Sequence, residues 1–274
     1  MVTQQKELET IKVAFFTVVF PKNEKFLLKF LSSLKSQSFK KFDLVVVNDG
    51  LKNFQDFKDN FIDLNIIDLD ITGSQTKNRE AGINYCIENK YDILIFGDSD
   101  DFFESNRIEK CVELLKDNDI VVNDLNLFDE NSVYQKMYLS KRLKNYQKID
   151  FNFIRNKNIF GLSNTAIRLK DFKKIELPTD LVALDWYIFS KLLIDGKKAI
   201  FTNDTVSYYR QHDFNTIGLK PLDELSFKFA LNVKIQHYKA LNKLNKNIYI
   251  DIKKLANKDF AKKKIDYPLW WEQI

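Results

Sequence analysis

One short apolar run that ends in three carboxylates constrains this chain more than any other feature. Ile93–Phe96 is a run of four apolar residues followed by Gly97, a pattern typical of a strand buried on both faces. Asp98, Asp100 and Asp101 follow directly. In open α/β sheets, ligands bind at the carboxyl ends of the strands. The run therefore predicts an α/β sheet with a binding site at this edge.

The three carboxylates also indicate a kind of ligand. Ionised carboxylates repel one another where a strand leaves the core, unless solvent or a cation offsets their charge. Mg²⁺ and Mn²⁺ prefer oxygen ligands and accept few protein contacts, so either ion, carrying a phosphorylated ligand, fits this motif. The alternative is a solvated turn before a helix, in which Asp101 or Ser105 serves as the cap.

Length and composition narrow the class of protein. The chain has 274 residues, 45% hydrophobic and 30% charged, which suits one large α/β domain with an appendage, or two small domains. Cys86 and Cys111 are expected to be reduced core residues, as in a cytoplasmic protein. The polar residues 1–10 do not resemble a signal peptide, and the apolar run Val13–Phe20 is too short to cross a bilayer. We therefore expect a cytoplasmic location.

The positive charge is concentrated in the last part of the chain. Residues 219–274 contain 12 Lys and 6 acidic residues, a balance of +6, so the net charge of +5 leaves −1 for residues 1–218. A neutral body argues against nucleic acid as a partner. The tail also carries apolar residues at helical spacing and the pair Trp270-Trp271. We expect a basic helical appendage that contacts the anionic inner face of a membrane, or else packs its apolar stripe on the main domain.

Strand and helix patterns alternate along the chain. Short runs rich in Val, Ile and Phe predict strands, and apolar residues at steps of three and four predict helices. The predicted strands are Val13–Phe20, Phe42–Asn48, Leu64–Asp68, Ile93–Phe96, Ile120–Asn123 and Ala199–Thr202. The predicted helices are Asn23–Gln37, Ser105–Lys116 and Leu184–Asp195, and the pattern turns helical from about Leu219. This alternation implies a mainly parallel sheet with helices on both faces.

Seven short motifs follow one another between residues 36 and 212. They are SQSF at 36–39, VVVNDG at 45–50, NREAGI at 78–83, DSDD at 98–101, FGLSN at 160–164, LDW at 184–186 and YRQH at 209–212. Their order resembles glycosyltransferase family 2, the inverting group with the Rossmann-like GT-A fold, of the bacterial surface-polysaccharide type. The resemblance covers residues 12–218. It implies a nucleotide-sugar and acceptor domain over residues 1–218, followed by the appendage at 219–274.

The resemblance assigns a donor site to particular residues. It implies that the nucleotide-sugar is bound by Phe20, Asp49, Arg79, Asp98, Asp100 and Asp101. Asp49 would accept the N–H of uracil, and Arg79 would offer a planar pair of donors to phosphate or base. Asp98, Asp100 and His212 would hold Mn²⁺ or Mg²⁺, with Asp98 alternatively on the ribose. Read as plain structure, Asp49 belongs to a turn, and Arg79 and His212 are surface residues.

The resemblance also assigns an acceptor side. Gly161 would lie in a loop near the acceptor, and Trp186 would form a wall against the acceptor sugar. Asp185 would be the general base, because inversion requires a carboxylate on the face opposite the leaving diphosphate. The alternative for Asp185 is a helix cap.

Two departures from the family pattern affect these assignments. Where the family has P-T-Y-N, this chain reads Val18–Asn23, so Phe20 takes the place of the aromatic against the base. Leu184 stands where the family has Glu. We expect an inverting, metal-dependent glycosyltransferase that moves a sugar from a nucleotide-diphospho-sugar, UDP-linked, to a glycan or lipid-linked acceptor. The alternatives are a non-catalytic nucleotide-sugar-binding subunit and a sugar nucleotidylyltransferase. A nucleotidylyltransferase would need a Gly-rich first loop, and residues Val18–Lys22 do not provide one.

Overall fold

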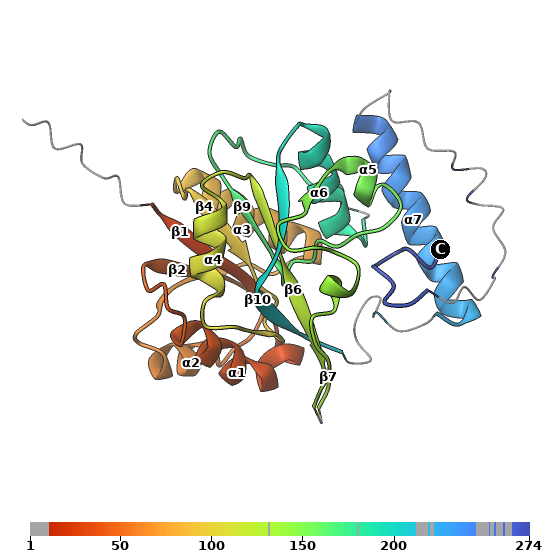
Figure 1. The fold of residues 1–274 in the computed structure, drawn as a ribbon. Helices are drawn as coiled ribbons and strands as arrows, with labels where there is room; N and C mark the ends of the chain where they lie inside the picture. Colours follow the sequence, from red (N-terminus) through yellow and green to blue (C-terminus); the bar gives the residue numbers. More distant parts are fainter. Residues whose placement is uncertain are drawn as a thin grey trace, which may run out of the picture.

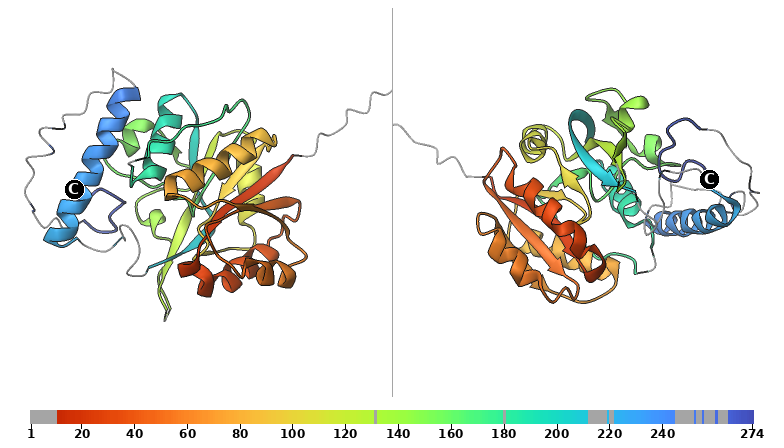
Figure 2. Two further views of the ribbon diagram at one scale, coloured as in Figure 1. Left: turned by 180° about the vertical axis from the view of Figure 1, so that it is seen from behind. Right: turned by 90° about the horizontal axis from the view of Figure 1, so that it is seen from below.

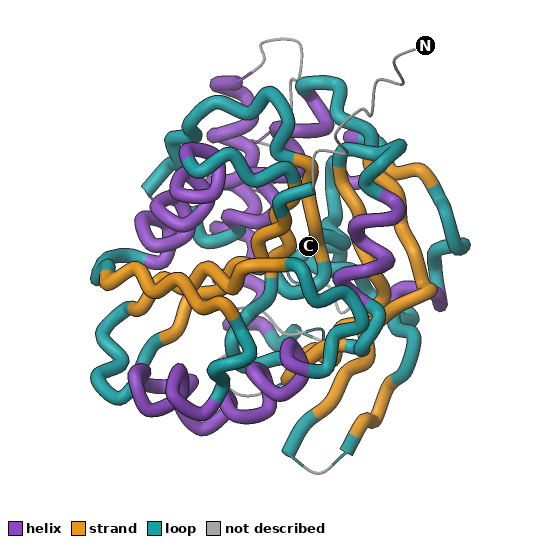
Figure 3. Tube along the Cα trace, turned by 90° about the vertical axis from the view of Figure 1, so that its left-hand side faces the viewer, coloured by secondary structure: helices purple, strands orange, loops and turns teal. Residues whose placement is uncertain are grey.

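One mixed sheet organises the molecule. The computed structural model describes residues 11–130, 132–179, 181–211, 219, 222–244, 252, 255, 260 and 265–274. Over these residues the strands form a ten-stranded sheet in the order β3-β2-β1-β4-β9-β6-β10-β5, with β7 paired to β6 and β8 to β10. Helices lie on both sides of the sheet (Figures 1 and 3).

The first five strands are β1 (Val13–Val19), β2 (Phe42–Asn48), β3 (Asn65–Asp70), β4 (Ile93–Phe96) and β5 (Phe102–Phe103). The others are β6 (Ile120–Phe128), β7 (Val133–Gln135), β8 (Lys148–Ile149), β9 (Thr165–Arg168) and β10 (Ala199–Arg210). The α-helices are α1 (Glu24–Lys35), α2 (Phe54–Asn60), α3 (Gln75–Glu88), α4 (Arg107–Leu114), α5 (Phe151–Ile154), α6 (Leu184–Ile194) and α7 (Glu224–Leu244). Two 3-10 turns are η1 (Pro21–Asn23) and η2 (Leu139–Lys141).

The part of the sheet formed by β1 to β4 is parallel, as the sequence pattern predicts. β1 pairs with β2 on one side and β4 on the other, so that Val13 lies beside both Phe42 and Ile93. Parallel strands in this register end at the same edge. The residues that follow β1, β2 and β4 therefore meet there, although they are separated by many positions in the sequence.

Two apolar layers cover the two faces of the sheet. Alternate residues of β2 belong to different layers, because successive strand side chains point to opposite faces: Leu44 and Val46 to one, Val45 and Val47 to the other. One layer holds apolar residues of α1, α2 and α4, and the other holds those of α3, α6 and α7. The expected helix-sheet-helix arrangement is confirmed.

The second half of the sheet differs from the prediction. β9 is antiparallel to both β4 and β6, and β5, β7 and β8 pair antiparallel with longer strands. β6 extends to Phe128 and β10 to Arg210, well beyond the predicted ends at Asn123 and Thr202. Every residue of β6 is buried, including Asn123, Asp124 and Asn126. Buried polar residues interrupt the apolar pattern, and for this reason the sequence pattern ends the strand too early.

The C-terminal helix packs on the body of the protein. Its stripe Phe227, Ala230, Val233, Tyr238 and Leu241 is buried in the same apolar layer as α6. Helix α7 lies at the edge of the molecule away from β1–β3 (Figure 2). Among the described residues, no helix is long and apolar enough to cross a membrane.

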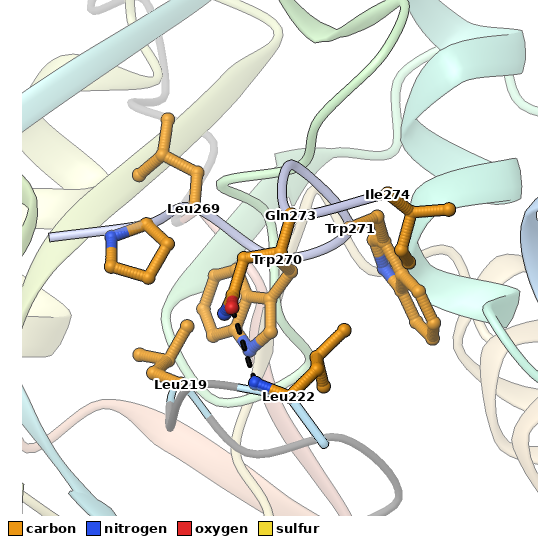
Figure 4. A pocket seen from close by; sticks show the side chains of 8 residues that line it. Leu219, Leu222, Leu269, Trp270, Trp271, Gln273 and Ile274 are labelled. Carbon is orange, nitrogen blue, oxygen red and sulfur yellow. Dashed lines mark hydrogen bonds between the residues drawn. The ribbon is translucent and has the colours of Figure 1, made fainter. Parts of the chain in front are cut away.

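Residues 265–274, here named the C-terminal segment, also pack on the body. Trp270 and Trp271 are 8% and 7% exposed, and Trp270 forms an antiparallel bridge with Asn158. Figure 4 shows Trp270 on the side of Leu219 and Leu222, with Trp271 beside Ile274, around a small hollow. The two tryptophans, which the sequence suggested for membrane contact, are therefore core residues of this fold.

Candidate active site

The acidic loop that joins β4 to β5 is fixed by contacts on several sides. Gly97 is required at its start because a Cβ there would lie 2.4 Å from the Phe15 ring. The hydroxyl of Ser99, 1% exposed, donates to the carbonyl of Val18 at 2.8 Å and accepts from the Asn23 amide at 3.2 Å. The loop is thereby attached to the carboxyl end of β1.

Asp101 holds protein elements together. It is 2% exposed, and its carboxylate accepts the backbone N–H of Arg210 at 2.7 Å and the hydroxyl of Ser163. Burial raises the pKa of Asp101 well above its usual value, and the charges of Asp100 and Asp98 add to the effect. Although the motif suggested a nucleotide-sugar contact for Asp101, both carboxylate oxygens are engaged by protein donors.

Asp98 of the acidic loop forms an ion pair with Arg79 of α3. An Nη of Arg79 lies 3.4 Å from an Asp98 carboxylate oxygen, and the Asp98 side chain keeps 37% of its surface exposed. Desolvation raises the pKa of Asp98, Arg79 opposes this, and the charge of Asp100 raises it further. The two carboxylates repel one another, which a bound cation would relieve.

The donor set at this point suits a hard divalent cation. Within the described ranges, no group of three or more His, Cys, Asp or Glu side chains lies close enough together to hold a metal ion. Asp98 and Asp100 supply two carboxylates, and His212, expected as a third ligand, lies outside the described residues. Mg²⁺ commonly takes one or two carboxylates and completes its shell with water and substrate phosphates, so the pair fits such an ion.

Arg107 places a buried positive charge behind the acidic loop. Its side chain is fully buried, donates to the carbonyl of Phe96 at 2.7 Å and to Asn123 at 3.0 Å, and lies over the Phe103 ring. Burial lowers the pKa of Arg107 to about 10, so the residue stays charged at neutral pH. The sequence analysis gave Arg107 no role. Its position at the start of the helix that follows an acidic motif could have indicated a basic residue that supports the acidic loop.

Phe20 and Asp49 lie where β1 and β2 end, at the same edge as the acidic loop. The N–H of Asp49 donates to the carbonyl of Val19 at 2.8 Å, and its carboxylate accepts the N–H of Gly73 at 3.3 Å. Phe20 is half-buried in extended backbone. The parallel register of β1, β2 and β4 thus brings these two residues to the edge that carries Asp98.

Helix α3 carries Arg79 close to β1 because of one glycine. A Cβ at Gly82 would lie 2.0 Å from the Phe16 ring, so only glycine lets the helix lie this close to the strand. One residue after Arg79, Glu80 accepts the N–H of Leu177 at 2.5 Å. Helix α3 therefore connects the donor edge with the loop that leads to α6.

Asp185 lies in the first turn of α6. Its carboxylate accepts the N–H of Trp186 at 2.7 Å and the side-chain amide of Asn158 at 3.4 Å. Burial raises the pKa of Asp185 to about 7, Arg79 opposes the shift, and Asp98 adds to it. These electrostatic interactions place Asp185 near Arg79 and Asp98, and a pKa near neutrality suits a general base.

Comparison with known proteins agrees with this geometry. The family model for glycosyl transferase family 2 matches residues 16–175, more than half of the chain. The chain belongs to glycosyltransferase family 2. The match ends before Asp185 and Arg210, so the family model covers the donor edge and the acidic loop but not α6 or the end of β10.

Solved structures show the same fold at low sequence identity. Staphylococcus aureus TarS 1–349 in complex with UDP-GlcNAc has a TM-score of 0.58 at 18% identity, covering 85% of this chain and 72% of that one. The mannosyltransferase PcManGT from Pyrobaculum calidifontis, in complex with GDP-Man and Mn²⁺, has a TM-score of 0.58 at 15% identity, with coverages of 84% and 64%. A search of curated protein sequences gives no match. The predicted GT-A fold is confirmed.

Hydrogen bonds of Asn164 hold the glycine loop of this family 2 glycosyltransferase in place. The N–H of Gly161 donates to the side chain of Asn164 at 2.8 Å, and Asn164 in turn donates to the carbonyl of Asn123 at 2.9 Å. A Cβ at Gly161 would lie 3.6 Å from the Trp270 ring. The loop expected on the acceptor side therefore lies between the sheet and the C-terminal segment.

Trp186 occupies a different place from the one expected. Its side chain is fully buried, its indole N–H donates to the carbonyl of Ile154 at 2.8 Å, and its ring stacks on His237 at 3.9 Å. Burial lowers the pKa of His237 to about 3, so that imidazole is neutral. A ring packed in the core does not form a wall against an acceptor sugar. Trp186 instead anchors the start of α6 in the core through its contacts with Ile154 and His237.

The residues before His212 connect β10 with the acidic loop. The Nε of Arg210 donates to the carbonyl of Asp100 at 2.8 Å, and its guanidinium lies over the rings of Phe26 and Phe128 at 4.1 and 4.4 Å. The sequence analysis singled out only the histidine of the YRQH motif. Ser163, Asn158 and Arg210 were also given no role, because their contacts come from distant parts of the chain.

Proposed function

We propose that this enzyme transfers a sugar, with inversion, from a nucleotide-diphospho-sugar to a hydroxyl of a glycan or lipid-linked acceptor, with the help of a divalent cation. The observation that carries the proposal is the position of Asp185. Its carboxylate has a pKa of about 7 and interacts electrostatically with Arg79 and Asp98. A base near neutrality opposite a phosphate-binding edge is what inverting displacement needs.

The donor half of the site suits a nucleoside diphosphate. Asp49 offers an acceptor for the base N–H, Phe20 offers an aromatic face, and Arg79 offers two planar donors to a phosphate. Complexes of TarS with UDP-GlcNAc and with UDP support a UDP-linked donor, whereas the mannosyltransferase is in complex with GDP-Man. Asp98 and Asp100, with His212, would hold Mn²⁺ or Mg²⁺, which as a Lewis acid neutralises the charge of a leaving diphosphate.

The acceptor half supplies the proton transfer. The acceptor oxygen bonds to the anomeric carbon from the face opposite the diphosphate, and the bond from that carbon to the diphosphate oxygen breaks. The hydroxyl proton passes to the Asp185 carboxylate, and the electron pair of the broken bond leaves with the nucleotide. Asn158 and the N–H of Trp186 hold the carboxylate in place during this step.

The test changes Asp185 to Asn. This substitution keeps size and hydrogen bonding but removes the base, so transfer should fall by about 10² to 10⁴ while the donor dissociation constant stays within twofold. Asp195→Asn, near the other end of the same helix and paired at the surface with Lys191, is the matched control and should retain wild-type transfer. Transfer by Asp185→Asn within threefold of wild type would exclude this base, and a product with retained configuration would exclude inversion.

We extend the proposal to peripheral contact with the inner face of a membrane. Its support is the basic balance of residues 219–274 and, on the outer side of α7, Leu225 and Phe229, which are 79% and 46% exposed next to Lys228. Trp270 and Trp271 do not contribute, because they are buried. Co-sedimentation with vesicles containing anionic lipid should show binding that salt weakens, and binding insensitive to salt, or none, contradicts the contact.

A further inference from the structure

The C-terminal segment lies directly against the elements that hold Asp185. The carbonyl of Trp270 accepts the N–H of Asn158 at 2.9 Å. The ring of Trp271 lies parallel to that of Trp186, with 6.1 Å between the ring centroids. Both of its partners, Asn158 and Trp186, contact Asp185. The segment is 80 to 89 positions away from Asp185 in the sequence and lies outside the range matched by the family model.

Asn158 connects this segment with the catalytic carboxylate. Its side chain is fully buried and makes two bonds with the backbone of Phe160, donating at 2.6 Å and accepting at 3.0 Å. These bonds fix the amide, whose N–H₂ group also donates to Asp185 at 3.4 Å. The backbone of Asn158 therefore pairs with the C-terminal segment while its side chain contacts the base.

Lys234 on α7 connects the loop before Asn158 with the C-terminal segment. Its side chain is 3% exposed, and its ammonium donates to the carbonyls of Asn156 at 2.8 Å, Trp271 at 2.9 Å and Ile274 at 3.0 Å. The ammonium also lies 5.9 Å from the Trp186 ring centroid. Three carbonyls on two separate segments thus share one ammonium, which sets the distance between the loop before Asn158 and the C-terminal segment.

Burying the Lys234 ammonium costs desolvation free energy, which its hydrogen bonds to three carbonyls offset. Moving an amine from water into a protein interior is unfavourable unless it is hydrogen-bonded, and an apolar side chain of the same volume is often as stable or more so. What the apolar substitute does not provide is directional bonding to three carbonyls. The structural effect of Lys234 is therefore a fixed arrangement around Asn158 and Trp186.

We propose that Lys234 is a positioning residue for sugar transfer, which holds the C-terminal segment against Asn158 and Trp186 and so sets the orientation of the Asp185 carboxylate. This role depends on the function of Asp185 as the base proposed above. Lys234 itself contacts neither donor nor acceptor in this assignment. The C-terminal segment becomes part of the catalytic structure, although no residue of it carries out chemistry.

The first experiment compares the same substitution at two lysines. Lys234→Met keeps an unbranched side chain, one atom shorter, and removes its three hydrogen bonds, whereas Lys191→Met on α6 alters a lysine that is 47% exposed and pairs with Asp195. Lys234→Met should lower kcat for transfer about tenfold, because small displacements of a catalytic group are costly, while the donor dissociation constant stays within twofold. Lys191→Met should leave both unchanged. Wild-type kcat for Lys234→Met, or an equal loss of donor binding, overturns the proposal.

A double-mutant cycle separates positioning of the base from a general effect on stability. If Lys234 acts through Asp185, adding Lys234→Met to Asp185→Asn should lower transfer by less than twofold, because the base is already absent. A further tenfold loss in that background overturns the positioning role and leaves the base assignment intact. Near wild-type transfer by Asp185→Asn alone instead contradicts the proposed function, so the two failures are distinguishable.

A milder variant covers the case in which Lys234→Met does not fold. Trp271→Phe keeps an aromatic ring but, because that ring is smaller, reduces the contact area with Trp186. It should lower kcat about threefold with unchanged donor affinity, and this loss should also disappear in the Asp185→Asn background. An unchanged kcat for Trp271→Phe overturns the role of the segment.

Discussion

The donor and acceptor sides of the proposed active site are built in different ways. The donor edge is formed by residues that directly follow β1, β2 and β4, with Arg79 on the adjacent helix α3. Parallel pairing in register brings these residues to one edge of the sheet. The acceptor side depends on Asn158, Lys234 and Trp271, which come from three separate parts of the chain and hold Asp185 by hydrogen bonds and ring packing. Local motifs define the first side, and only tertiary contacts define the second.

The largest expected effects come from Asp100 and Asp101, two adjacent carboxylates of the acidic loop. We expect the first to affect ligand binding and the second to affect stability. Asp100→Ala should weaken nucleotide binding in the presence of Mn²⁺ by about 10² or more, with little change in thermal stability, because Asp100 is a proposed ligand of the cation. Asp101→Ala should instead lower the free energy of unfolding by about 1–3 kcal/mol, because it leaves the Arg210 N–H without its acceptor.

Calorimetry with UDP and Mn²⁺, together with thermal unfolding, measures both effects. Wild-type affinity in Asp100→Ala would contradict the metal site. Unchanged stability in Asp101→Ala would contradict the structural role given to that residue.

Two glycines test how tightly each side is packed. Gly82→Ala should cost about 1–3 kcal/mol of unfolding free energy, because the new Cβ would overlap the Phe16 ring at 2.0 Å. Gly161→Ala should cost less, because its nearest contact is a side-chain oxygen of Asn164 at 3.0 Å. Urea unfolding of both variants gives the comparison, and a larger loss at Gly161 would reverse the ranking of the two sides.

The pKa of Asp185 predicts opposite effects of pH on activity and stability. Transfer should rise with pH through an apparent pKa of about 7, or somewhat lower with the cation bound, because the base acts as the carboxylate. Its pKa is raised above the value of 3.8 for a free carboxyl, so the native state binds more protons than the unfolded state between about pH 4 and 7. The contribution of Asp185 to stability therefore falls as pH rises through that window.

Asp185→Asn should remove both effects. The variant should be inactive across the range and melt at a higher temperature than wild type at pH 8, with a smaller difference at pH 4. Melting curves at the two pH values measure this. A variant less stable than wild type at pH 8 would show that the hydrogen bonds of Asp185 outweigh the cost of burying its charge.

The smallest expected effect concerns the connection between the two sides. Glu80→Gln keeps an oxygen acceptor for the Leu177 N–H but removes the charge, so stability should fall by about 0.5–1.5 kcal/mol. Donor affinity should stay within twofold, because Arg79 is unaffected, and transfer should fall about twofold. A loss of donor affinity larger than the loss of transfer would show that Glu80 serves the donor edge.

The sequence by itself predicts the donor edge well. An apolar run such as Ile93–Phe96, followed by carboxylates, specifies both a buried parallel strand and the position of its polar end, because the strand period and the sheet edge follow from local residues. The motifs around Asp49, Arg79 and Asp98 therefore define the fold and the family. The same reasoning places the start of α6, and with it Asp185.

Other features were decided only by the tertiary structure. Whether Asp101 contacts a ligand or Arg210, and whether Trp186 faces solvent or His237, depends on which distant side chains fill the neighbouring space. The same holds for the C-terminal tryptophans, which a basic amphipathic pattern suggests for a membrane and which the fold buries. Periodicity reports that a side chain is apolar or polar, but its partner is set by packing between elements far apart in the chain. Local sequence motifs therefore predict the residues of the donor edge, whereas the environment of the proposed base is determined by contacts between distant parts of the chain.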